Sequence, residues 1–144
     1  MTATTRLTTP TPMTSPTSET WVTARVVGTP SPACRPRVTR FGTYYAKAYE
    51  TWMADCQKQL AEQVKTPLTG NLWCAVEIIC TKPRTGKLEL PRGDVDNYGK
   101  GVLDGGTKAG VWGDDGQIEF FLITKRYGRP GEEPGAIINA GVLQ

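Results

Sequence analysis

The sequence predicts an α/β (α+β) domain in which a small mixed β-sheet of about four strands packs with two main helices. Two kinds of pattern lead to this prediction. Short β-branched and aromatic stretches are bounded by glycine and proline, and other stretches carry apolar residues at three- and four-residue intervals. Their order along the chain is strand, helix, strand, helix, strand, strand. At 144 residues the chain is sized for one such domain.

The first 20 residues differ from the rest of the chain. They contain nine threonines, three prolines and two serines, with scarcely an apolar side chain to offset the entropy cost of ordering. We expect residues 1–20 to be a disordered tail and residues 21–144 to be the folded domain. Because no apolar run approaches roughly 20 residues and the N-terminus lacks the apolar core of a secretory signal, we expect a cytoplasmic protein without a membrane partner.

The first half of the domain contains one predicted strand and one predicted helix. The stretch "WVTARVV", residues 21–27, is typical of a strand. The proline-rich segment that follows carries Arg35, Arg37 and Arg40 without an acid, which predicts an exposed basic loop. Thr43 is the predicted N-cap of a helix that ends before Pro67. The apolar stripe of this helix consists of Tyr45, Tyr49, Trp52, Met53, Cys56, Leu60 and Val64.

The second half contains three predicted strands. "LWCAVEIIC", residues 72–80, is too short and too β-branched for a helix, and we interpret it as a central strand. Residues 81–93 form a basic loop with four cations against the single acid Glu89. Residues 117–127 and 135–143 predict two more strands, joined by a turn of glycine, proline and glutamate.

Histidine is absent from the chain, and the four cysteines, at positions 34, 56, 74 and 80, lack the spacing of zinc ligands. A zinc site is therefore not expected, and nucleophilic schemes that need a histidine base are excluded. We interpret the cysteines as small buried apolar residues. Any chemistry has to come from carboxylates, lysine and metal.

Acidic residues concentrate between positions 94 and 115 of a protein whose net charge is +3. In an extended segment Asp94 and Asp96 point the same way, and a divalent metal ion between them best relieves their repulsion. Asp96 is the predicted N-cap of a second helix, from which Lys100 faces the side of the acidic pair. Asp114 and Asp115 follow in a turn that can return one of them to the same place. We therefore expect Asp94, Asp96 and one of these two aspartates to converge as a metal-binding cup.

Each part of this pattern also has a simpler explanation. The D-x-D-N string can be a pair of helix-capping acids in a polar loop. Lys100 and Asp104 can be an i, i+4 ion pair, which contributes about 0.3 kcal/mol. The "GDDG" string can be an ordinary turn. The joint arrangement of acids and lysine across an extended segment, a helix and a turn favours a functional site.

The chain contains the string Asp94-Val-Asp96-Asn97-x-x-Lys100-x-x-x-Asp104, followed by Ala109-Gly110-Val111-Trp112-x-Asp114-Asp115. This pattern closely resembles the signature of RusA-type Holliday junction resolvases, and a weaker resemblance covers residues 21–143. The resemblance implies that Asp94, Asp96, Lys100 and Asp115 are catalytic, and that Asp94, Asp96 and Asp115 bind the metal. Where relatives usually have alanine or leucine, this helix has glycine at 99, 101, 105 and 106, at a cost of roughly 1 kcal/mol each. We expect the helix to depend on packing.

The activity implied by the resemblance is structure-selective cutting of DNA by paired symmetric nicks across a four-way junction. Oxygen ligands suit Mg²⁺, with Mn²⁺ as a substitute. The implied partners are branched DNA and a second copy of the chain in a homodimer, and phages or prophages commonly encode such proteins. Basic segments at 35–40, 82–92 and 125–129 are expected to bind phosphates. The alternatives are a non-cleaving, architectural junction-binding protein and a less selective metal nuclease that cuts flaps or forks.

Overall fold

The computed structural model describes residues 20–33, 37–44 and 46–143, and the predicted tail falls almost entirely outside them. Its main sheet has four strands in the order β1-β6-β4-β5. These are β1 (Trp21–Val27), β4 (Leu72–Cys80), β5 (Ile118–Tyr127) and β6 (Gly135–Val142). Strand β4 is central, because it pairs parallel with β5 and antiparallel with β6, and β1 pairs antiparallel with β6. The predicted mixed four-stranded sheet is confirmed.

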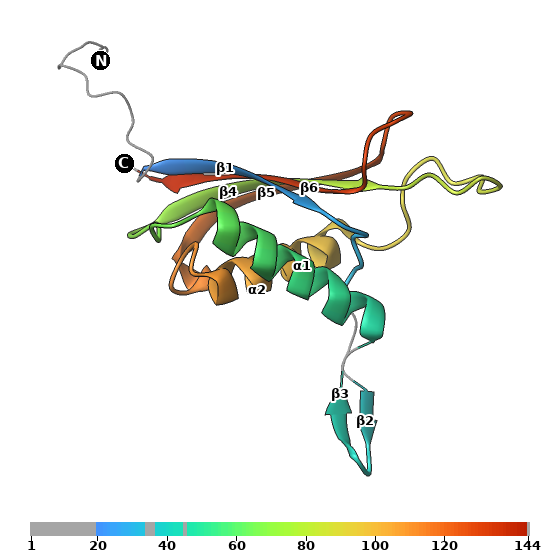
Figure 1. Ribbon diagram of the computed structural model, residues 1–144, viewed down its shortest axis with the longest axis horizontal. Helices are drawn as coiled ribbons and strands as arrows, with labels where there is room; N and C mark the ends of the chain where they lie inside the picture. Colours follow the sequence, from blue (N-terminus) through green and yellow to red (C-terminus); the bar gives the residue numbers. More distant parts are fainter. Residues whose placement is uncertain (1–19, 34–36, 45, 144) are drawn as a thin grey trace.

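Two helices, α1 (Lys47–Gln63) and α2 (Val95–Ala109), lie on the same face of the sheet (Figure 1). The core fills the space between the helices and the sheet. Its largest fully buried side chains include Trp52 and Leu60 of α1, Ile78 of β4, and Trp112 beyond α2. The predicted apolar stripe of α1 is largely confirmed, since Tyr49, Trp52, Cys56 and Leu60 are all buried. Neither helix of the described ranges is long and apolar enough to span a membrane.

The start of α1 differs from the prediction. The helix begins at Lys47 after Ala46, which makes no side-chain cap, whereas the predicted N-cap Thr43 belongs to a strand. Residues 37–44 form a two-stranded antiparallel hairpin of β2 (Arg37–Thr39) and β3 (Gly42–Tyr44). The β-branched residues of this segment favour extended backbone, and Gly42 has φ 128°, a conformation that suits glycine. The predicted stripe residue Tyr45 lies outside the described ranges.

The glycines of α2 let this helix pack closely against its neighbours. Gly99, Gly101, Gly105 and Gly106 are all buried. A methyl group at Gly105 would lie 2.6 Å from Cβ of Cys56 on α1, and one at Gly99 would lie 2.5 Å from the Ile123 side chain on β5. The glycines that weaken the isolated helix therefore allow the tertiary contacts that hold it in place.

Candidate active site

Two of the predicted site residues lie at the N-terminal end of α2. Asp94 is the N-cap residue, with extended backbone and no side-chain capping bond, and Asp96 lies in the first turn. The prediction of Asp96 as the N-cap was therefore wrong, because the helix already begins at Val95. Both carboxylates are exposed. They share the helix terminus where the backbone dipole favours negative charge.

The segment before Asp94 is fixed through its backbone carbonyls. The Lys125 ammonium donates to the carbonyl of Pro91 at 2.7 Å and to that of Gly93 at 2.5 Å. The Tyr98 hydroxyl donates to the carbonyl of Arg92. A third anchor comes from Tyr127, which donates to the carbonyl of Leu90 at 3.0 Å. Strand β5 and the first turns of α2 thus hold the chain that delivers Asp94.

Sequence analysis missed these anchors, because an isolated lysine or tyrosine carries no signal of the carbonyl that it meets. A cavity of about 450 Å³ lies beside them, and Tyr98, Tyr127, Arg92 and Lys87 are among its lining residues. Burial, together with the nearby Cys80 thiol, raises the pKa of Tyr98 to about 12. Its hydroxyl therefore remains a hydrogen-bond donor across the neutral pH range.

Lys100 lies on α2 one turn beyond Asp96, and its side chain is 54% exposed. Its Nζ is 3.6 Å from Oδ2 of Asp104, which also accepts a hydrogen bond from the Tyr49 hydroxyl at 3.2 Å. Asp104 is thereby fixed by α1 and can restrain Lys100 on the side of α2 that carries Asp96. The exposed i, i+4 pair itself contributes little to stability.

Asp114 and Asp115 follow the other end of α2. The Asp114 carboxylate accepts from the Gly116 N–H at 3.1 Å, and this caps the short 3₁₀ helix η1 (Asp115–Gln117). The Gln117 amide donates to the carbonyl of Gly70 at 3.0 Å and so ties η1 to the segment before β4. Both aspartates are exposed, and the Asp114 carboxylate has a structural role because it caps η1.

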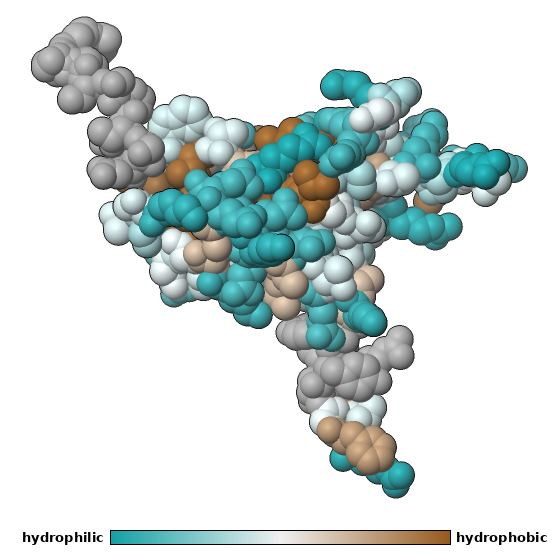
Figure 2. Space-filling model, viewed as in Figure 1, coloured by the Kyte–Doolittle hydropathy of each residue, from teal (hydrophilic) through white to brown (hydrophobic). Residues whose placement is uncertain are grey.

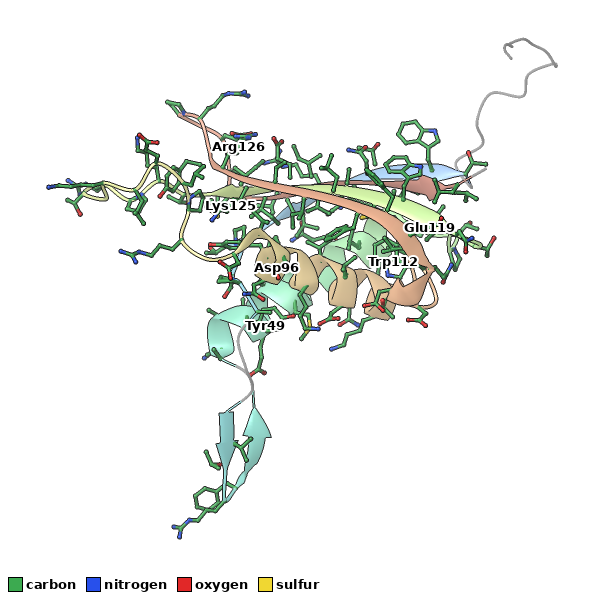
Figure 3. All side chains as sticks on the ribbon, turned by 180° about the vertical axis from the view of Figure 1, so that it is seen from behind. Tyr49, Asp96, Trp112, Glu119, Lys125 and Arg126 are labelled. Carbon is green, nitrogen blue, oxygen red and sulfur yellow. The ribbon has the colours of Figure 1, made fainter. Side chains whose placement is uncertain are left out.

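The two groups of acids are separated by the length of α2. Fifteen helical residues span about 22 Å. Contacts at both ends confirm this layout, since Lys125 binds the Gly93 carbonyl at one end and Trp112 packs against Gly106 at the other. Figure 3 shows the same separation: Asp96 lies toward the Lys125 end of β5, and Trp112 lies toward Glu119.

The expected convergence of Asp94, Asp96 and Asp115 is not found within one chain. Among the described residues, no group of three cysteine, aspartate or glutamate side chains could hold a metal ion. Asp94 and Asp96 alone still suit Mg²⁺, which proteins commonly bind through one or two carboxylates together with substrate phosphates and water. The α2 N-terminus therefore offers a partial site for a hard cation, and Asp115 is remote from it.

The predicted basic segments differ in how many of their cations are free to bind phosphates. In segment 125–129, Lys125 is bound to carbonyls, and the Arg126 guanidinium bonds Glu132 at 2.7 Å and Glu77 at 3.2 Å. The Arg126 side chain lowers the pKa of Glu132 to about 2, with a further backbone bond from Arg129. Residues 82–92, in contrast, are exposed apart from Pro91. The cations of residues 82–92 can bind phosphates, whereas the side chains of Lys125 and Arg126 make hydrogen bonds and ion pairs within the domain.

Comparison with known proteins adds one finding. A family model described as "Endodeoxyribonuclease RusA" matches residues 28–139, which is most of the chain and includes every predicted site residue. No curated protein matches the chain.

Proposed function

The chain belongs to the RusA endodeoxyribonuclease family and is thus a Holliday junction endonuclease, and from this premise we propose its metal, its active-site residues and its assembly. We propose a Mg²⁺-dependent, structure-selective enzyme that resolves four-way junctions by paired symmetric nicks in recombination and repair. Nucleases of the family depend on divalent metal ions and bind branched DNA. The observation that carries the proposal is the exposed Asp94 and Asp96 pair on an anchored helix terminus.

Asp94 and Asp96 are proposed to bind Mg²⁺, which when bound lowers the pKa of a water ligand and neutralises charge that develops on the scissile phosphate. Lys100 is proposed to contact that phosphate or the attacking water, since it lies one turn from Asp96 and is half exposed. Asp104 holds the ammonium of Lys100 at 3.6 Å and so limits where it can reach. No histidine is needed for this chemistry.

Asp115 is proposed as the third metal ligand, supplied by a second copy of the chain. Within one chain it is separated from Asp94 by about the length of α2. In a two-fold dimer with the β5 edges antiparallel, the Ile118 end of one strand approaches the Lys125 end of the other. Asp115 precedes Ile118, and Lys125 lies beside Gly93, so each site would receive Asp115 from the partner. Strand β5 suits this role, because it is an edge strand of the main sheet: it pairs with β4 on one side, and its other side can pair with a second chain.

The test of this function is cleavage of a synthetic four-way junction with and without Mg²⁺. We expect Asp96→Asn to abolish cutting and to retain gel-shift binding of the junction, because most binding energy comes from phosphate contacts elsewhere. Glu62→Gln, which removes an exposed carboxylate from α1, is the matched control and should cut normally. Undiminished cutting by Asp96→Asn would exclude this carboxylate from the mechanism.

Two other activities fit part of the same observations. A non-cleaving, architectural protein would bind the junction but produce no nicks with Mg²⁺ or Mn²⁺. A less selective metal nuclease would cut flaps, forks and junctions at similar rates, so rates on these three substrates and on linear duplex distinguish it. We also propose that the gene is of phage or prophage origin and that the enzyme acts in the cytoplasm, which the gene's genomic neighbourhood and cell fractionation would test.

A further inference from the structure

The β2–β3 hairpin carries large apolar side chains that contact little of the domain. Strand pairing of Thr39 with Gly42 leaves Arg40 and Phe41 as the two-residue turn. The Phe41 side chain is 86% exposed and that of Val38 is 79% exposed. The hairpin extends away from the helices and the sheet, and apolar atoms lie at its outer end (Figures 1 and 2). An aromatic tip held in water has an energetic cost that a binding partner would remove.

The turn holds Phe41 in a defined position. The Phe41 N–H donates to the Thr39 hydroxyl oxygen at 3.1 Å, and the same hydroxyl donates to the Gly42 carbonyl at 3.3 Å. The Arg40 guanidinium lies 4.9 Å from the centre of the Phe41 ring, which is the geometry of a cation–π contact. The tip therefore presents an aromatic face and a cation together.

The charge of this segment favours a nucleic-acid partner over a second copy of the chain. Residues 20–49 contain four arginines and one lysine but no aspartate or glutamate. Two such hairpins in contact would bring like charges together, whereas a DNA backbone would neutralise them. Aromatic and arginine side chains are also the groups on which unpaired bases stack.

The hairpin begins near the proposed catalytic acids. The Ala33 N–H donates to the carbonyl of Asn97 in the first turn of α2 at 2.9 Å, and Pro32 lies against Gly93. The chain is thus fixed to the α2 N-terminus only a few residues before β2. Figure 3 shows the hairpin on the same side of the domain as Asp96 and Tyr49. A branched DNA molecule bound on this side of the domain could contact both the acids and the hairpin.

We propose that the hairpin binds the branch point of the junction, with Phe41 stacking on a base that has lost a stacking neighbour there and Arg40 contacting a neighbouring phosphate. This inference rests on the proposed function, because it assigns the hairpin the task of recognising branched DNA. Bases at a branch point lose part of their stacking, so an aromatic ring can replace a lost neighbour at low cost. Linear duplex offers no such base, and the hairpin would therefore contribute to structure selectivity.

The test uses the full chain and a four-way junction with 2-aminopurine at the branch point, in EDTA so that binding is observed without cutting. The wild-type chain should decrease 2-aminopurine fluorescence on binding, because stacking of the Phe41 ring on the base quenches it. Phe41→Ala should abolish the decrease and weaken junction binding about tenfold, the order of one lost base–aromatic stack. Phe41→Trp should preserve both, and Leu143→Ala, an exposed apolar residue in the C-terminal segment, should change neither.

Because Phe41 is exposed, Phe41→Ala should melt at the wild-type temperature, so a loss of binding would not reflect unfolding. If Phe41→Ala decreases the fluorescence and binds the junction as the wild type does, the proposal is overturned. A lower mass of Phe41→Ala than of wild type in sedimentation would overturn it as well and assign the hairpin to self-association. Failure of the proposed function is a separate outcome, seen when the wild-type chain binds the junction with Mg²⁺ but never cuts it.

Discussion

Mixing two inactive variants should restore cutting if each active site is shared between two chains. The variants are Asp96→Asn and Asp115→Asn, which remove acids at opposite ends of α2. Each homodimer has two damaged sites. A mixed dimer combines the intact Asp94 and Asp96 of one chain with the intact Asp115 of the other, so one of its two sites is complete.

The fraction of active sites expected in the mixture follows from the geometry of α2. Oxygens of carboxylates that share one Mg²⁺ ion lie within about 4 Å of each other, whereas α2 separates the two groups by about 22 Å. No side-chain rotation spans that gap, and the buried glycines of α2 hold the helix against α1 and β5. In an equimolar mixture half of the dimers are mixed, so about one quarter of the wild-type number of sites should be active.

The assay is single-turnover nicking of a labelled junction after the two variants are co-expressed, which allows the chains to mix. We expect about one quarter of the wild-type nicking rate, with nicked junctions accumulating, because a mixed dimer cuts one strand of a pair. The control mixture is Asp94→Asn with Asp96→Asn. Asp94 and Asp96 of any one site come from the same chain, so every site in this mixture lacks one of them and the mixture should stay inactive. No recovery in the first mixture, with mixed dimers verified by mass, would refute a site shared between chains.

Three further predictions concern the surroundings of the site. Lys125→Met should slow cutting about 10- to 100-fold with unchanged junction affinity, because the carbonyls of Pro91 and Gly93 lose their anchor and Asp94 shifts; single-turnover rates and gel shifts measure this. Gly105→Ala should lower the free energy of unfolding by about 1–3 kcal/mol in urea titration, since overpacking against α1 exceeds the gain in helix propensity. Glu132→Gln should be less stable than wild type above pH 4.5. This difference should vanish as the pH falls toward 2, because the Glu132 carboxylate of the folded wild type then becomes protonated. Urea titrations at several pH values test this.

The sheet and the apolar face of α1 could be predicted from the sequence because their signals are local. The β-branched runs of β1 and β4 and the three- and four-residue spacing from Tyr49 to Leu60 each reflect one element burying one face. The hairpin was missed because prolines and arginines around residues 30–40 are typical of a loop, and three-residue strands carry too short a pattern. Thr43 was then assigned to the next helix because a threonine before an apolar stripe is also typical of an N-cap.

The shared position of Asp94, Asp96 and Lys100 on α2 could be predicted from the sequence, whereas the position of Asp115 could not. The spacing of Asp94, Asp96 and Lys100 predicts that they lie together near one end of α2, because all three fall within two helical turns. The position of Asp115 depends on the direction in which the chain leaves α2. The segment between α2 and η1 is a short turn that contains glycine. Such a turn can lead the chain back toward Asp94 and Asp96, or away from them into β5 as the structure shows.

The distribution of charge along α2 gives a physical reason for expecting two-fold assembly. Asp94 and Asp96 lie at one end of the helix with Lys100 one turn further along, and Arg92 and the start of the hairpin adjoin that end. Asp115 follows the other end. An asymmetric contact could complete one site and would leave the second incomplete. A two-fold axis across the β5 edges, as proposed above, would complete both sites equally and would present two hairpins and two basic loops to one DNA molecule. A four-way junction has matching symmetric strands, so the same axis that completes the metal ligands would also align the two cuts.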